Sequence, residues 1–182
     1  AMVRPGRERL SGEVEVDEAF VGGEEPGVHG RETLTKALVA IAAEVKGRGI
    51  GRIRLQRIPD ASQRTLEAFV REAVAEGAVV RTDGWGGYAG LREAGYRHRP
   101  RQAPPGNRAA ETRLHPRVHR VASLLKRWLL GTHQGHVDLK HLPLYLDEFV
   151  FRFNRRTSSA RGQLFYRLLQ HAVLLPPTPY RP

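Results

Sequence analysis

The sequence contains no cysteine among its 182 residues. Disulfide bonds and cysteine-ligated zinc are therefore excluded within these residues, and any metal ion must be bound by oxygen atoms or imidazole nitrogens. The hydrophobic runs are too short to span a bilayer, and the N-terminal stretch AMVRPGRERL lacks the apolar segment of a secretory signal. We therefore expect no membrane contact and a cytoplasmic location.

Acidic residues are also scarce. The chain has 30 Lys and Arg but only 19 Asp and Glu, which gives a net charge of +11 with neutral histidine. Residues 1–100 hold 16 basic and 15 acidic side chains, whereas residues 101–182 hold 14 and 4. Most of the basic residues are arginine, whose planar guanidinium suits bidentate phosphate contact. The pattern predicts a nucleic-acid binder, with a solvated basic face or a codon bias towards arginine as the alternative.

The first half of the chain has the alternating hydrophobic pattern of a β-sheet. Alternation predicts a strand at residues 13–21. The alanine-rich residues 34–45 would also suit a helix, but a glycine-rich turn at 47–51 leads directly from them into the alternating run 52–58. This arrangement favours two further strands, and the three strands together form a predicted antiparallel meander.

A helix and two more strands are predicted after the meander. Ser62 is a suitable N-cap for a helix over residues 63–75. A strand at 78–82 after this helix implies a crossover, so we expect it to lie parallel to a neighbouring strand. A short helix at 88–94 and a fifth strand at 96–99 complete the prediction. The expected fold is α/β, with a five-stranded mixed sheet flanked by helices.

The second half of the chain has a helical pattern. Residues 99–113 are rich in Pro, Gly and Arg without an apolar period, which predicts a long mobile loop. The first helix beyond it is expected to stop at Gly131, which would leave His133 and Gln134 in a loop. The three helices predicted here span residues 116–130, 138–156 and 161–174, and a proline-rich tail follows them.

Two aspartates stand at informative places in the predicted sheet. Asp17 lies within the first strand, where aspartate is disfavoured without a functional reason. Asp83 ends the fourth strand just before Gly84, a position that also suits an Asx turn. If these strands are neighbours, the two carboxylates converge at one edge of the sheet. Mg²⁺ uses one or two carboxylates, and two such ions about 4 Å apart promote in-line displacement at phosphorus.

The helix predicted at 116–130 carries a third candidate. His119 and Lys126 are seven residues apart and share one helical face, with the small residues Ala122 and Ser123 between them. His119 stands where a third metal ligand or a general base would be needed. The basic residues of this helix expected to bind DNA are Arg117, Arg120, Lys126 and Arg127.

Four motifs carry a family resemblance. They are DEAFVGG, TDGWGGY, SLLKR followed by GTHQG, and YLDEFVFRFNRR, in this order along the chain. Together they resemble the catalytic domain of bacterial insertion-sequence transposases of the DDE superfamily, which has an RNase H-like fold. The particular group they resemble carries an N-terminal zinc ribbon. Because cysteine is absent, these residues contain no zinc ribbon, which is a departure from that group.

The resemblance implies a three-acid site with Asp17 and Asp83 in the first two positions. Aligning the SLLK run places His119 at the third acid and Lys126 at the following lysine, so the chain resembles a D-D-H-K variant. Glu111 is a weaker candidate for the third acid. The expected cofactor is Mg²⁺ or Mn²⁺, as a two-ion site, with Asp17, Asp83 and His119 as ligands. Imidazole favours Mn²⁺ over Mg²⁺.

The resemblance also implies an activity and its partners. The expected reaction is metal-dependent cleavage of double-stranded DNA at transposon ends, followed by transfer of the 3′-hydroxyl into target DNA. A homodimer or larger assembly is expected, since two ends are handled together. The alternatives are an RNase H-like nuclease without strand transfer and a catalytically inactive DNA-binding protein derived from a transposase.

The expected domain organisation is an extension at 1–10, a catalytic domain at 11–158 that includes the loop 99–113, and a C-terminal helix and tail at 159–182.

Further residues expected to bind DNA come from two of the motifs. Trp85 and Tyr88 could stack on an unpaired base, with packing over the sheet edge as the alternative. The remaining candidates, expected to hold the DNA backbone, are Arg152, Arg155 and Arg156.

Overall fold

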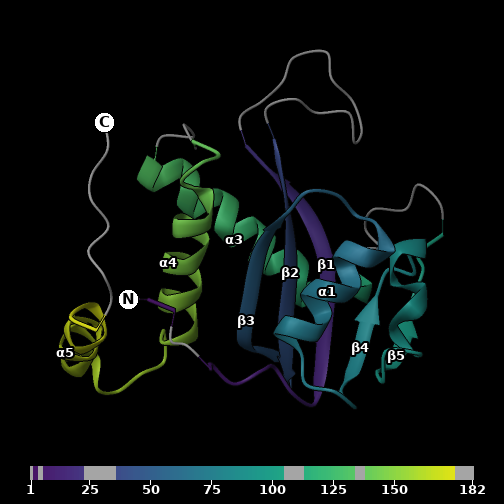
Figure 1. The fold of residues 1–182 in the computed structure, drawn as a ribbon, viewed down its shortest axis with the longest axis horizontal. Coiled ribbons are helices and arrows are strands. Elements are labelled where there is room, and N and C mark those ends of the chain that lie inside the picture. Colours follow the sequence, from purple (N-terminus) through teal and green to yellow (C-terminus); the bar gives the residue numbers. More distant parts are fainter. Residues whose placement is uncertain (1, 4–5, 23–35, 105–112, 134–137, 175–182) are drawn as a thin grey trace.

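Five strands form one mixed sheet, in the order β3-β2-β1-β4-β5, in the computed structural model of the chain (Figure 1). β1 (Glu13–Val21), β2 (Ala37–Lys46) and β3 (Gly49–Ile58) make an antiparallel meander. β4 (Val79–Thr82) lies parallel to β1, and β5 (Arg97–Pro100) lies parallel to β4. The predicted five-stranded mixed sheet of an RNase H-like fold is therefore confirmed. The structure describes residues 2–3, 6–22, 36–104, 113–133 and 138–174.

Helices cover both faces of the sheet. Figure 1 shows α1 on one face and α3 on the other, while α4 runs beside β3 and α5 lies apart from the sheet. As predicted, Ser62 caps α1, since its hydroxyl oxygen accepts a hydrogen bond from the Thr65 N–H at 3.4 Å. The helices are α1 (Gln63–Ala73), the 3₁₀ helix η1 (Gly86–Leu91), α3 (Pro116–His133), α4 (Leu142–Asn154) and α5 (Arg161–Ala172). No helix in the described ranges is long and apolar enough to cross a membrane.

Two predicted helix limits are wrong. α3 does not stop at Gly131 but continues to His133. The His133 ring stacks on Tyr145 at a centroid distance of 4.1 Å and meets Trp128 edge-on at 5.3 Å, so tertiary contacts hold the last turn. The helix expected from residue 138 begins only at Leu142, because residues 138–141 form a turn. Gln134, Glu111 and residues 105–112 of the predicted loop lie outside the described residues.

The alternation of side chains along β1 divides its residues between two cores. Val14 and Val16 pack with α1 on one face, whereas Val21 packs with α3 and α4 on the other. Because successive side chains of a strand point to opposite faces, Glu15 and Asp17 lie on the α3 side. One face of the central strand thus brings charged residues to α3.

Glu15 anchors the start of α3. Its side chain is fully buried, and its Oε2 atom accepts hydrogen bonds from the N–H groups of Arg117 (2.7 Å) and Val118 (3.2 Å). Its Oε1 atom lies 2.8 Å from Arg117 Nη1. The first N–H groups of a helix have no intrahelical partner and attract negative charge. The buried carboxylate therefore determines where α3 meets the sheet.

Arg117, one of the residues predicted to bind DNA, completes this anchor. Its Nε atom donates to the Gly49 carbonyl at 3.0 Å, and its Nη2 atom donates to the Gly47 carbonyl at 2.5 Å. Only 14% of its side chain is exposed. Its guanidinium is thus engaged by Glu15 and by the turn between β2 and β3, which gives Arg117 a structural role that the sequence did not predict.

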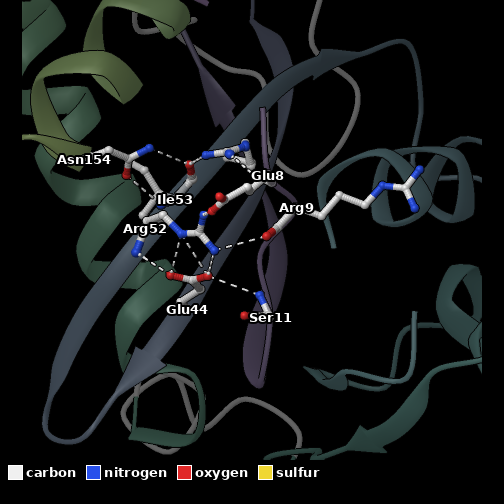
Figure 2. Close-up of polar contacts among 8 residues, drawn as sticks. Glu8, Arg9, Ser11, Glu44, Arg52, Ile53 and Asn154 are labelled. Atoms are coloured by element: carbon white, nitrogen blue, oxygen red, sulfur yellow. Dashed lines mark hydrogen bonds and ion pairs between the residues drawn. The ribbon is translucent and has the colours of Figure 1, made fainter. Parts of the chain in front are cut away.

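A second polar network joins the N-terminal segment to the meander (Figure 2). The Arg52 guanidinium contacts the Glu44 carboxylate at 2.7 Å and the Glu8 carboxylate at 3.1 Å. Glu44 also accepts a hydrogen bond from the Ser11 N–H at 3.1 Å. Partial burial raises the pKa of Glu44, but the hydrogen bonds from Arg52 and Ser11 outweigh it and lower the pKa below its usual value. The network ties residues 8–11 to β2 and β3.

Asn154 closes the open edge of β3. Its amide donates to the Ile53 carbonyl at 3.1 Å and accepts from the Ile53 N–H at 2.8 Å, as Figure 2 shows. An edge strand with unpaired backbone groups is a site for unwanted strand pairing. The last residue of α4 therefore takes the place of a neighbouring strand at this point of the edge.

The Glu15 anchor predicts a large difference between two glutamates of β1. Glu15→Gln should lower the free energy of unfolding by about 3 kcal/mol, because it leaves a largely buried guanidinium without its counter-charge. Glu13→Gln is the matched control, since its ion pair with Arg81 is partly exposed, at 28% and 20% for the two side chains. We expect the decrease to stay below about 1 kcal/mol for this control. Urea unfolding measures the free energy of unfolding of both variants. Equal decreases in the two would contradict the proposed anchor.

Candidate active site

The parallel pairing of β1 and β4 aligns the two aspartates. Glu15 and Arg81 form the last residue pair between these strands. Asp17 and Asp83 each lie two residues further along the chain, so they reach the same level at the same edge of the sheet. Asp17 remains within β1, opposite Ile41 of β2, whereas Asp83 is the first residue after β4.

The structure places Asp17, Asp83 and His119 around one cavity of about 430 Å³. The His119 Nε2 atom lies 3.9 Å from Asp17 Oδ2, and 34% and 20% of the two side chains are exposed. Because α3 is anchored by Glu15, the helix carries His119 directly over Asp17. The three residues expected to form the site therefore meet at one place.

Asp83 also has the local structure of a turn residue. Its Oδ1 atom accepts a hydrogen bond from the Trp85 N–H at 2.9 Å, which is the Asx turn that the TDGW motif allows. Gly84 has a φ of +82°, a conformation that glycine adopts without strain. The turn and the cavity position are compatible, because the turn occupies only one carboxylate oxygen and fixes the direction of the other.

Lys126 lines a cavity on the other side of His119. This cavity of about 370 Å³ is also lined by Asp17, Ala122 and Ser123. The small side chains between His119 and Lys126 leave this space open along α3. Hence the structure brings Lys126 together with Asp17 and His119, on one face of the helix as the spacing predicted.

The prediction that Tyr88 stacks on a base is wrong. The Tyr88 side chain is fully buried, and its hydroxyl donates to Glu18 Oε2 at 2.7 Å. Burial raises its pKa well above the usual value, and the nearby carboxylates of Glu18, Asp17 and Asp83 raise it further. Tyr88 therefore stays a neutral hydrogen-bond donor that holds Glu18 beside the cavity. Its ring belongs to the core.

The other predicted DNA-binding residues divide into two groups. Trp85 is 42% exposed, with its ring nitrogen donating to the Ala61 carbonyl at 3.0 Å, close to the cavity. The predicted DNA-binding residues of α3 other than Arg117, which are Arg120, Lys126 and Arg127, are also exposed.

The arginines at the end of α4 lie elsewhere. Arg156 donates to the carbonyls of Ile50 and Gly51 at the start of β3, which is the opposite end of the sheet from Asp83. Arg155 lies over the Phe151 ring at 3.9 Å. The structure therefore does not bring these two to the aspartates. Arg152, two-thirds exposed, forms an ion pair with Glu148 at 2.8 Å.

Three polar cavity residues were missed by sequence reasoning. His115, Arg101 and Gln102 line the same cavity as the two aspartates. His115 is buried, and its Nε2 atom lies 3.2 Å from the Arg101 carbonyl oxygen. A histidine just before a helix carries no signal in the sequence. The alternation of arginine in RHRPR, residues 97–101, was a signal that could have pointed to Arg101.

The donor set fits a hard cation only in part. Among the described residues, no group of three or more His, Asp and Glu side chains is close enough to hold a metal ion. Two carboxylates at one level are nevertheless what Mg²⁺ requires, because this ion takes its other ligands from water and phosphate oxygens. Asp17 and Asp83 could therefore hold such an ion, with His119 close by.

Comparison with known proteins identifies the family. No curated protein matches the chain. Residues 9–154, however, match the ISXO2-like transposase domain. This span covers most of the chain and includes the whole sheet, both aspartates and α3. The chain therefore belongs to the ISXO2-like transposase domain family.

Proposed function

We propose that this chain cleaves DNA strands at transposon ends and transfers the new 3′-hydroxyl into target DNA. The observation that carries the proposal is the cavity where Asp17 of β1 and Asp83, directly after β4, meet, in a chain of a transposase family. In the first step a water oxygen bonds to phosphorus as the bond to the 3′-oxygen breaks. In the second, that 3′-hydroxyl attacks a target phosphodiester and releases a target 3′-hydroxyl.

Asp17 and Asp83 would bind the divalent cation, Mg²⁺ or Mn²⁺, and a second ion of the same kind fits the proposal. When bound, the metal supplies Lewis-acid activation of the nucleophile and stabilises charge on the leaving oxygen. The Asx turn prepares Asp83 for this role by directing its carboxylate. The hydrogen bond from the Glu18 N–H to Asp17 Oδ1, at 2.8 Å, does the same for Asp17.

His119 would act as a third ligand or as a general base. Its ring is partly exposed at the cavity, and its Nε2 atom faces Asp17. Imidazole in place of a third carboxylate removes one negative charge from the site and favours Mn²⁺ over Mg²⁺. The expected D-D-H-K arrangement therefore implies a metal preference different from that of an all-carboxylate site.

The exposed basic face of α3 would hold the DNA. Lys126 lines the cavity next to His119, which suits contact with the phosphate beside the scissile bond. Trp85 is exposed near Asp83 and offers a ring on which an unpaired base can stack. The residues of α3 proposed to bind phosphates are Arg120, Lys126 and Arg127. The partner is double-stranded DNA, bound by a dimer or a larger assembly.

A catalytically inactive DNA-binding protein is the second candidate. It is favoured by the lack, among the described residues, of a three-ligand metal cluster. An assay of the wild-type protein distinguishes the enzyme from the inactive DNA-binding protein. The protein is incubated with Mg²⁺ or Mn²⁺ and with duplex DNA that carries the ends of its own element. Binding without nicking or joining would support the inactive protein and contradict the enzyme. Nicking without joining of a pre-cut 3′ end would indicate a nuclease.

Removal of either carboxylate should abolish the reaction. Asp17→Asn and Asp83→Asn should each lower the cleavage rate about 100-fold or more, because metal stabilisation of transition-state charge is worth several kcal/mol. Asp138→Asn is the matched control, since Asp138 lies half exposed in the turn before α4. Gel-based cleavage of end-labelled DNA measures all three. Wild-type rates in the Asp17 and Asp83 variants would refute the assignment.

Replacement of His119 tests the third position separately. His119→Ala should abolish most of the cleavage activity, whereas His119→Glu should retain activity and shift the metal preference from Mn²⁺ towards Mg²⁺, since carboxylate oxygen suits the harder ion. The measurement is the ratio of cleavage rates in the two metals for each variant. Full activity of the alanine variant would exclude His119 from the site.

A further inference from the structure

We propose that Arg99 and Arg101 bind phosphates of the DNA strand that is cut, on the β5 side of the cavity. The proposal rests on the proposed function and extends it, since it names a second phosphate-binding surface apart from α3. Both residues belong to the edge strand β5 or follow it directly. The two arginines are called the β5 arginine pair below.

The register of the sheet places Arg101 beside the aspartates. Arg99 pairs with Arg81 of β4, and Arg81 pairs with Glu15 of β1. Two residues further along each chain segment stand Arg101, Asp83 and Asp17. Arg101 lines the same cavity as both aspartates, which agrees with this register. Two residues beyond this row of paired residues, the three neighbouring chain segments therefore carry two carboxylates and one guanidinium side by side.

The backbone around Arg101 is held on several sides. Its N–H donates to the Thr82 carbonyl at 2.8 Å, and its own carbonyl oxygen lies 3.2 Å from His115 Nε2. The next side chain, Gln102, donates to the Gly84 carbonyl at 3.2 Å. These contacts fix the chain to both sides of Asp83 and to the start of α3. The Arg101 side chain nevertheless stays exposed, which is the arrangement of a preorganised binding residue.

The charges of the β5 arginine pair are not neutralised within the described residues. Both side chains are exposed, and the ion pairs found among the described residues include neither guanidinium. Arg81, one strand away, is by contrast paired with Glu13 at 2.6 Å. An exposed arginine pair next to a cavity lined by aspartates provides positive charge where a phosphate backbone must pass.

The spacing of the pair suits one DNA strand. Alternate residues of a β-strand lie about 6.7 Å apart, which is of the order of the through-space separation of successive phosphates along one DNA strand. The pair therefore matches neighbouring phosphates of one strand, with Arg101 nearest to the scissile bond. Arg97 is not part of this surface, because its Nε atom donates to the Gly77 carbonyl at 3.0 Å, at the other end of β5.

The test measures the salt dependence of DNA binding. Fluorescence anisotropy with a labelled duplex of about 30 base pairs gives log K against log salt, and the slope changes by about 0.9 for each phosphate that the protein no longer neutralises. We expect this change for Arg99→Gln and for Arg101→Gln, and about twice the change for the double variant. Arg101→Lys should keep the wild-type slope because it keeps the charge. Arg71→Gln, at an exposed arginine in the last turn of α1 on the opposite face, is the matched control and should also keep the slope.

The outcomes separate this proposal from the function on which it rests. Thermal unfolding of each variant checks that the fold is intact, which we expect because the Arg101 contacts are made by its backbone. If the wild-type protein cleaves DNA but both glutamine variants keep its salt slope, phosphate binding by the β5 arginine pair is refuted and the proposed function stands. If the wild-type protein neither binds nor cleaves DNA, both fall.

Discussion

A buried carboxylate on the central strand determines where α3 lies on the sheet. Glu15 is inaccessible to water, and its oxygens accept hydrogen bonds from Arg117 Nη1 and from two N–H groups in the first turn of α3. A buried charge is tolerated only when such partners satisfy it, so the start of α3 has one favourable position on the sheet. His119 follows two residues after Arg117, and its place over Asp17 depends on this contact.

The cavity exists because two neighbouring strands separate. The pairing of β1 with β4 ends at Glu15 and Arg81, although β1 continues to Val21. Backbone hydrogen bonding no longer fills the space beyond that pair, and the two aspartates stand where it opens. Each carboxylate already accepts one local backbone N–H, which limits its rotation. The result is a pocket with two carboxylates in a strongly basic chain, which is where we propose that a cation binds.

The excess of arginine is less informative than its distribution. Arg117 anchors α3, and Arg54 is buried, with its guanidinium donating to the carbonyls of Ile53 and Glu8. Burial, followed by the nearby charges of Arg7 and Arg52, lowers the pKa of Arg54 to about 10. Such residues add to the net charge without offering it to DNA. The exposed arginines of α3 and of the β5 arginine pair are the ones that we propose bind DNA.

Local patterns by themselves determined the strands, the Ser62 cap, the parallel crossover and the family, because alternation, capping and short motifs are properties of neighbouring residues. They also indicated Asp17, since a carboxylate within a strand needs a reason. Only the tertiary structure decided that Tyr88 and Arg117 face inward, that α3 runs past Gly131, and that Arg101 and His115 join the cavity. Those outcomes depend on which distant groups meet across the sheet, such as Glu15 with Arg117, and a one-dimensional pattern does not contain that information.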